Sequence, residues 1–171
     1  MDVKGHVGLG SNCTLHGNLV LRTHHGGRIN LGDSVTVADY VMIQSNASVT
    51  IGDGVYVGPY TVIRDTNHTF HGTDIHWRLT PHITKPIHIE KNCYIGARTY
   101  ILPGVTIGEG ALIAPGSILT KNVAPFEVWA GAPSAQRIAH RMDADKASRL
   151  KRHSELLSLY GFAVAAEEDH D

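Results

Sequence analysis

Aliphatic residues recur at every sixth position along most of the chain. A period of six fits neither the 3.6-residue period of an amphipathic helix nor the alternation of an ordinary hairpin strand. It is typical of a solenoid in which each side of a coil is a short strand followed by a tight turn. The longest run is Ile89, Ile95, Ile101, Ile107, Ile113 and Leu119, and earlier runs are Leu9 to Leu21, Leu31 to Ile43 and Ile51 to Ile63.

The positions beside the aliphatic residue also repeat. The residue after it is often Gly, as at Gly58 and Gly96, which we interpret as allowing the corner conformation. Four residues after it the side chain is small or β-branched, and Cys13 and Cys93 both occupy this position. We therefore expect both cysteines to be compact core residues without redox or metal chemistry. Three hexapeptides would close one triangular coil, so the sequence predicts an all-β parallel β-helix around an aliphatic column.

Two interruptions break the period. Residues 45–50 add two residues between Ile43 and Ile51, and the much longer segment between Ile63 and Ile89 must leave the coil as an excursion loop over about residues 65–86. Long loops on a regular scaffold are where function usually resides. We therefore place the candidate site at this loop.

The period ends after Pro125. Residues 145–160 have an apolar stripe at helical spacing and are followed by Gly161, so we predict a C-terminal α-helix there. The expected organisation is a β-helix domain over 1–128, a C-terminal segment with the helix over 129–162, and an acidic tail over 163–171.

Composition excludes several functional classes. Fifteen Lys and Arg residues against sixteen Asp and Glu give a formal net charge of −1, which argues against a nucleic-acid-binding protein. No apolar run is long enough to span a membrane, and the first residues contain no apolar stretch that could act as a secretory signal. We expect a cytoplasmic protein without a disulfide framework.

Residues 95–123, IGARTYILPGVTIGEGALIAPGSILTKNV, are followed by the Trp129-Ala-Gly-Ala-Pro133 segment. Together they resemble the hexapeptide-repeat O- and N-acetyltransferases, including the maltose and galactoside, nodulation and surface-polysaccharide enzymes. The resemblance implies a left-handed β-helix, a homotrimer with an active site at each subunit interface, and acetyl-CoA as acetyl donor. It also implies acetyl transfer to a hydroxyl or amine of a sugar-type acceptor, in surface-polysaccharide or glycan biosynthesis.

The resemblance assigns the general base to His68. In the family, a histidine at the start of the extended loop removes a proton from the acceptor, which attacks the thioester directly. Neutral imidazole suits this role, and general-base help is typically about 10²–10⁴-fold. Asp65 lies three residues earlier and has two readings, as the group that orients the imidazole or as a turn residue.

Other site residues follow from the same resemblance. The pantetheine arm would pass Ala97, Ala114 and Pro115, while Lys121 would contact a phosphate of the coenzyme. Arg137 is a further candidate for the nucleotide phosphate.

On the acceptor side, Asn46 lies where the galactoside enzymes carry an acid, and Tyr94 lies where relatives often have Trp. His71 would also face the acceptor, and it is the next candidate for the base.

The loop also contains His76 and His82, but the spacing of its histidines matches no compact zinc pattern and no Cys lies nearby. We expect no metal. Two rival functions share the fold: an antibiotic acetyltransferase and a γ-class carbonic anhydrase with zinc held by three histidines. The sequence leaves the acceptor and the choice between O- and N-acetylation open.

Overall fold

The computed structural model describes residues 5–69 and 76–141. The chain divides into two compact units, Met1–His140 and Arg141–Asp171. The helix predicted over 145–160 and the acidic tail lie outside the described residues. Among the described residues, no helix is long and apolar enough to cross a membrane.

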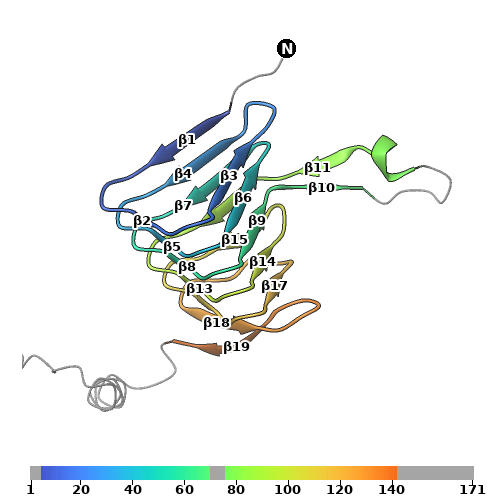
Figure 1. Cartoon of the computed structure of the whole chain (residues 1–171). Coiled ribbons are helices and arrows are strands. Elements are labelled where there is room, and N and C mark those ends of the chain that lie inside the picture. The colour runs from blue at the N-terminus through green and yellow to red at the C-terminus, as the bar shows by residue number, and fades with distance from the viewer. Residues whose placement is uncertain (1–4, 70–75, 142–171) are drawn as a thin grey trace, which may run out of the picture. The chain divides into compact units, whose positions relative to one another are not determined.

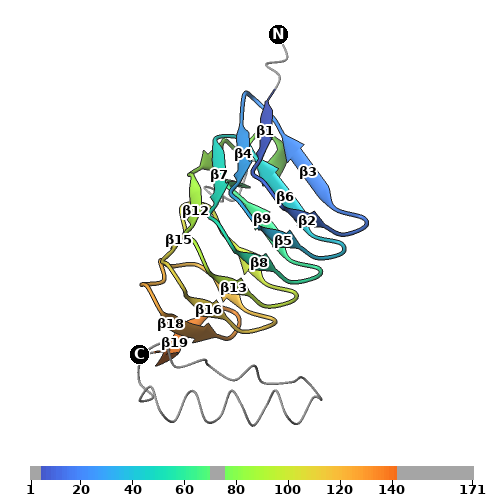
Figure 2. The ribbon, with the colours of Figure 1, turned by 90° about the vertical axis from the view of Figure 1, so that its left-hand side faces the viewer.

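Unit 1 is a parallel β-solenoid with three sheets, each formed by one side of every coil (Figures 1 and 2). Sheet A contains β1 (His6–Leu9), β4 (Arg28–Leu31), β7 (Ser48–Ile51), β12 (Ile87–Ile89) and β15 (Thr106–Ile107). Sheet B contains β2 (Thr14–Leu15), β5 (Thr36–Val37), β8 (Tyr56–Val57), β13 (Tyr94–Ile95), β16 (Leu112–Ile113), β18 (Glu127–Ala130) and β19 (Gln136–His140). Sheet C contains β3 (Val20–Thr23), β6 (Met42–Ser45), β9 (Val62–Arg64), β14 (Tyr100–Ile101) and β17 (Ile118–Leu119).

The predicted left-handed β-helix is confirmed, and its aliphatic column is the core. Ile51, Ile63, Ile95, Ile101 and Ile107 are all 0% exposed. Successive coils place these residues directly above one another, since Ile51 pairs with Ile89 and Ile89 with Ile107. Burying each such side chain stabilises the fold by about 1.5–3 kcal/mol relative to leaving it in water.

The column is less complete in the first coil. Leu9 and Leu15 share the repeat position, yet they are 53% and 39% exposed in the described structure. Both cysteines are free thiols, and Cys93 is buried with its Sγ 3.1 Å from the carbonyl oxygen of Gly108. Cys93 therefore fills core space, as its repeat position predicted.

The repeated glycines serve a purpose other than the predicted one. Gly58 and Gly96 do not have positive φ; a Cβ at Gly58 would lie 2.6 Å from the amide nitrogen of Ala97, and one at Gly96 would lie 2.5 Å from the nitrogen of Pro115. Glycine is required there because the next coil approaches too closely for a side chain. The positive φ occurs two residues later, at Tyr60 and Arg98.

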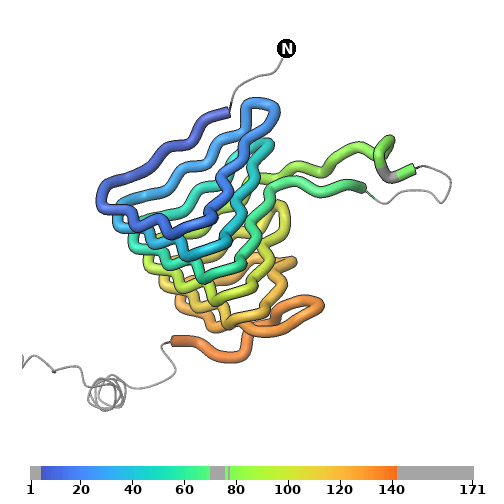
Figure 3. Tube along the Cα trace, viewed as in Figure 1, coloured from blue at the N-terminus to red at the C-terminus, as the bar shows by residue number. Residues whose placement is uncertain are grey.

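The excursion leaves the solenoid between β9 and β12 (Figure 3). Its described parts form an antiparallel ribbon of β10 (Thr66–His68) and β11 (His82–Thr84), with the 3₁₀ turn η1 (Trp77–Leu79) before β11. At the other end, β18 pairs parallel with β16 and antiparallel with β19. The boundary predicted at residue 128 therefore falls inside β18.

Candidate active site

The excursion begins at Asp65, at the corner between sheets C and A, which we call the C–A corner. Asp65 is 0% exposed, and its carboxylate accepts hydrogen bonds from the hydroxyl of Ser45 and the amides of Asn46 and Ala47, each at 2.8 Å. At this position the chain leaves the coil, and the Asp65 carboxylate provides the hydrogen-bond acceptors for the adjacent Ser45–Ala47 turn. A buried amide without such an acceptor is costly.

His68 ends strand β10 and pairs directly across the ribbon with His82. The two Nε2 atoms are 3.2 Å apart, and the ring centroids are 4.2 Å apart. Nδ1 of His68 lies 3.4 Å from the hydroxyl of Thr80. The half-buried His68 ring is thus contacted on both nitrogens, an arrangement that can hold one tautomer and present an imidazole for proton transfer.

Sequence reasoning missed Thr80 and His82 as neighbours of His68, because the register of β10 against β11 cannot be derived from spacing. From the sequence, Asp65 could either orient the His68 imidazole or serve as a turn residue. Within the described structure the carboxylate of Asp65 bonds to the Ser45–Ala47 turn and makes no hydrogen bond to His68. This geometry favours the turn reading.

Asn46 lies beside Asp65 at the same corner. Its amide donates to Asp65, while its side-chain Oδ1 is buried without a hydrogen-bond partner in the described structure. A buried acceptor without a partner is costly unless a water molecule or a ligand supplies a donor. Asn46 and His68 therefore both lie near the start of the excursion, and their roles as acceptor-binding residue and general base stay predictions.

The residues predicted to line the pantetheine arm, Ala97, Ala114 and Pro115, lie at the opposite edge of sheet C, at the B–C corner. A surface hollow there is lined by Pro59, Tyr60, Ala97, Arg98, Pro115 and Gly116. Tyr60 stacks on Tyr40 with ring centroids 5.0 Å apart, and the guanidinium of Arg98 lies 5.7 Å from the Tyr60 ring. The hollow brings together Ala97 and Pro115 from successive coils, with Ala114 adjacent in sequence.

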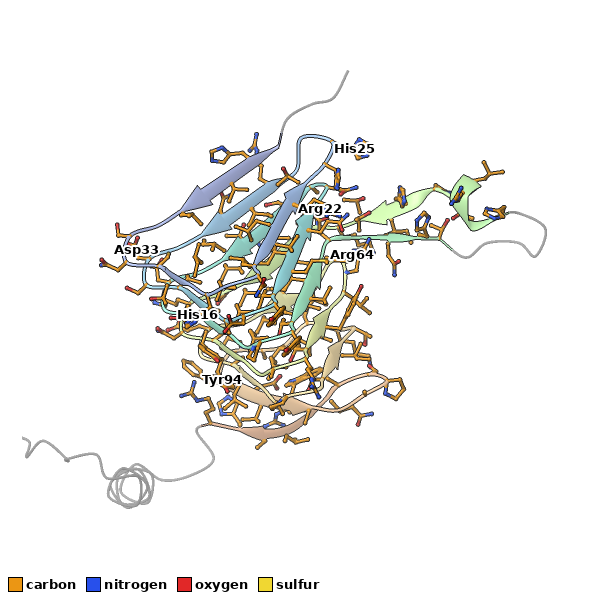
Figure 4. The ribbon with its side chains drawn as sticks, in the orientation of Figure 1. His16, Arg22, His25, Asp33, Arg64 and Tyr94 are labelled. Atoms are coloured by element: carbon orange, nitrogen blue, oxygen red, sulfur yellow. The ribbon has the colours of Figure 1, made fainter. Side chains whose placement is uncertain are left out.

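Tyr94 is on the outer face of sheet B, where it stacks on Tyr56 at 5.1 Å. It is 43% exposed and lies on the side of the solenoid away from the excursion (Figure 4). Within one chain it is therefore not beside His68. His71 lies outside the described residues.

Lys121 is exposed in the connection after β17. Arg137, on β19, forms an ion pair with Glu127, with Nε 3.1 Å from Oε1. Their predicted contacts with the coenzyme phosphates remain predictions. In residues 5–69 and 76–141, no group of three His, Cys, Asp or Glu side chains is placed to hold a metal ion.

Glu127, on β18, connects this strand to β19 through its ion pair with Arg137. Its pKa lies below the ordinary value of 4.5, chiefly because the indole of Trp129 donates to the carboxylate at 2.8 Å, with help from the Ala124 amide and Arg137. Partial burial acts in the opposite direction.

We expect Glu127→Gln to lower the thermal unfolding midpoint at pH 7 by roughly 2–4 °C, the effect of about 1 kcal/mol in a chain of this size. A lowered folded-state pKa stabilises the fold above the unfolded pKa, and this stabilisation is lost as pH falls through the folded value. The difference between wild type and variant should therefore shrink between pH 5 and pH 3 in thermal melts. A difference that is constant over this range would contradict the assignment.

Known proteins resemble this chain in both sequence and structure. Residues 86–121 match the family model for the bacterial transferase hexapeptide, described as six repeats. Galactoside O-acetyltransferase of Escherichia coli is 35% identical over 112 residues, which is 64% of this chain and 53% of that protein. The chain spans about half or less of the curated relatives it matches first.

Two solved structures are similar over most of unit 1. A hexapeptide-repeat-containing acetyltransferase of Vibrio cholerae, in complex with acetyl coenzyme A, has a TM-score of 0.70 and 30% identity, covering 82% of this chain and 73% of that one. A galactoside acetyltransferase in complex with coenzyme A has a TM-score of 0.70 and 32% identity, covering 82% and 67%. With this identity and coverage, and with the repeat and fold described above, the chain belongs to the hexapeptide-repeat acetyltransferase family.

Proposed function

We propose that this protein transfers the acetyl group of acetyl-CoA to a hydroxyl or amine of a sugar-type acceptor, in surface-polysaccharide or glycan biosynthesis. The observation that carries the proposal is the His68 ring, contacted on both nitrogens at the base of the excursion of an acetyltransferase solenoid. The relatives add support, since their structures hold acetyl coenzyme A or coenzyme A and one is named for galactosides.

His68 would act as general base. In the productive tautomer its Nδ1–H donates to Thr80, which leaves the Nε2 lone pair toward His82 and the acceptor. When the acceptor replaces His82 at Nε2, the imidazole takes the hydroxyl or amine proton as the oxygen or nitrogen attacks the thioester carbonyl. The carbon–sulfur bond then breaks, and the proton passes from His68 to the departing thiolate.

The hollow at the B–C corner fits the pantetheine arm of acetyl-CoA. Ala97 is small and Gly116 has no side chain, so the main chain of these corners is accessible to an amide-bearing ligand. Lys121 follows β17, so within one chain it lies across sheet C from this hollow; in a site shared between copies its exposed ammonium would offer a compact cation for a phosphate.

Acetyl transfer requires the donor and the base to meet, but in one chain they lie at opposite edges of sheet C. A site formed between copies resolves this separation, and we propose the homotrimer implied by the family. An apolar row on the outer face of sheet C supports such an interface. It runs through paired residues of the five coils: Val20, Met42, Val62, Tyr100 and Ile118.

We expect light scattering at micromolar concentration to give three times the chain mass of 18.5 kDa. A Met42→Glu variant should shift the protein toward monomer, because a carboxylate in an apolar interface is costly to desolvate. Its matched control is Thr36→Glu, on the outer face of sheet B. A wild-type protein that stays monomeric would exclude the shared site.

The function itself is tested by thiol release from acetyl-CoA with a panel of sugars, nucleotide-linked amino sugars and antibiotics. Thiol release that depends on a sugar-type acceptor is the expected result. Release with antibiotics alone would instead support the xenobiotic branch of the family. Activity that is lost with a chelator would point to a zinc enzyme.

A further inference from the structure

Charged residues are segregated between two edges of the solenoid. The A–B corner carries acidic side chains, whereas the C–A corner carries basic ones; Figure 4 shows Asp33 on the side opposite Arg22, His25 and Arg64. The basic set at or beside the C–A corner is Arg22, His24, His25, Arg28, Arg64, Lys85 and Lys121, and the acidic set is Asp33, Asp53, Glu90 and Glu109. Of the acidic residues in the described ranges, only Asp65 lies at the C–A corner. Its carboxylate is buried and committed to the Ser45–Ala47 turn.

Arg22 and Arg64, with Gln44 between them, form a row on the outer face of sheet C, at the C–A end of the strands and two residues beyond the apolar row proposed for the subunit interface. Arg22 pairs with Gln44 in the strand register, and Gln44 pairs with Arg64. Neighbouring strands are about 4.8 Å apart, so the row places two guanidinium groups on either side of one amide over about 10 Å. The residues just before them, Ile43 and Ile63, are buried, which directs the row outward.

The row has no anionic partner within the described part of the chain. Neither Arg22 nor Arg64 forms an ion pair there. Arg64 is half-buried, and its Nε is buried without a hydrogen-bond partner. A buried donor without an acceptor is destabilising unless a ligand supplies one. Arg64 is therefore unlike an arginine of an ordinary solvated face, whose nitrogens are open to water, whereas Arg22 is exposed.

The row is also close to the reacting end of the proposed site. Arg64 precedes His68 by four residues, which limits their Cα separation to about 14 Å. Asn46, with its own unpartnered Oδ1, flanks the same corner. Arg64 and Asn46 therefore both belong to the corner from which the excursion that carries His68 begins.

We propose that Arg64, together with Gln44 and Arg22, forms an oxyanion subsite, and that the acceptor is an anionic sugar carrying a carboxylate or a phosphate. The proposal rests on the acetyltransferase function and specifies its acceptor class. The guanidinium fork matches the two oxygens of a carboxylate or phosphate, and the Gln44 amide adds a neutral donor between the two cations. Within residues 5–69 and 76–141, the one carboxylate at this corner is that of Asp65, which is bonded to the Ser45–Ala47 turn and does not occupy the fork.

The first test compares acceptors that differ in charge. Thiol release is measured with glucose, glucuronate and glucose 6-phosphate, so that the two anionic arms separate carboxylate from phosphate recognition. We expect at least one anionic sugar to exceed glucose by about tenfold or more in kcat/KM, the value of a charge-assisted hydrogen bond. Arg64→Gln should remove this preference, and Arg64→Lys should restore part of it because charge remains but the fork is lost. Lys91→Gln removes one charge at the A–B corner and should leave the preference unchanged.

The second test does not depend on acetyl transfer. The Nε–Hε resonances of the arginines are followed by NMR during titration with glucuronate and with glucose 6-phosphate, and the Arg64 signal is identified by its absence in Arg64→Gln. We expect the Arg64 signal to shift with at least one probe and the Arg98 signal to remain in place. A shift at Arg64 without any thiol release would refute the proposed function while supporting the subsite. An Arg64 signal that is unmoved by both probes, or equal losses in Arg64→Gln and Lys91→Gln, would overturn the subsite.

Discussion

His68→Ala is expected to lower the rate of acetyl transfer by roughly 10²-fold or more, with the acceptor established by the thiol-release panel. The expected size is that of a lost general base. Without the imidazole, the acceptor hydroxyl would attack with its proton still attached, or through water. The effect should fall on kcat and on kcat/KM alike, because the base acts in the transition state and contributes little to substrate binding.

Cofactor binding provides the control for this prediction. The proposed coenzyme hollow lies at the B–C corner, across sheet C from His68, so the Kd for coenzyme A should be nearly unchanged in His68→Ala. Lys121→Ala should behave in the opposite way, with KM for acetyl-CoA raised about tenfold and a smaller change in kcat. A chelator added to the wild type should leave the rate unchanged.

Three outcomes would contradict the assignment. If His68→Ala keeps full activity, the base lies elsewhere, and His71 is the next residue to replace. If His68→Ala and Lys121→Ala both lose only affinity for the cofactor, His68 contributes to cofactor binding and is not the general base. If the chelator abolishes the rate, the loop histidines should be reconsidered as metal ligands.

The core could be predicted from the sequence because one side chain per hexapeptide points inward. Ile95 and Ile101 are six residues apart, lie on different sheets, and are both fully buried. This relation depends only on local geometry that repeats without change. The same reasoning failed at Leu9 and Leu15, whose burial depends on neighbouring coils on both sides and not on their own position in the repeat.

The repeated glycines were recognised in the sequence, but the corner conformation predicted for them is not the reason they are required. Gly58 and Gly96 repeat because the next coil passes within 3 Å of where a Cβ would be. That contact involves residues 39 and 19 positions away, Ala97 and Pro115, so it becomes visible only once the coils are stacked. At these two corners the positive φ falls on Tyr60 and Arg98, whose residue types carry no sequence signal for it.

The sequence predicts where the candidate site lies but not which residues surround His68. The break in the period marks the excursion, and the family resemblance selects His68. The neighbours of His68 depend on the register of β10 against β11, which brings Thr80 and His82 to it from 12 and 14 residues away. The oxyanion row arises in a similar way, because Arg22, Gln44 and Arg64 align only through the coil lengths between them.

Asp65→Ala is expected to destabilise the fold by about 3 kcal/mol or more. The buried carboxylate accepts three hydrogen bonds, and hydrogen bonds to charged groups contribute about 1.5–3 kcal/mol each without adding fully. Alanine would leave the partly buried amides of Asn46 and Ala47 without this acceptor. Asp65→Asn should also be costly, since its NH₂ group would face one of those donors. Urea unfolding measures both losses.

An exposed carboxylate with a similar backbone contact provides the matched control for Asp65→Ala. Asp53 accepts the amide of Asp33 at 2.8 Å in an exposed setting, so Asp53→Ala should cost no more than about 1 kcal/mol, because water can replace the lost acceptor. At a temperature where Asp65→Ala remains folded, its kcat should fall far less than that of His68→Ala. If Asp65→Ala has normal stability but a 10²-fold lower kcat, the assignment of Asp65 to the turn is wrong. Asp65 would then be the residue that orients His68, in a conformation of the excursion other than the one described, since the carboxylate would have to exchange the Ser45–Ala47 turn for the imidazole.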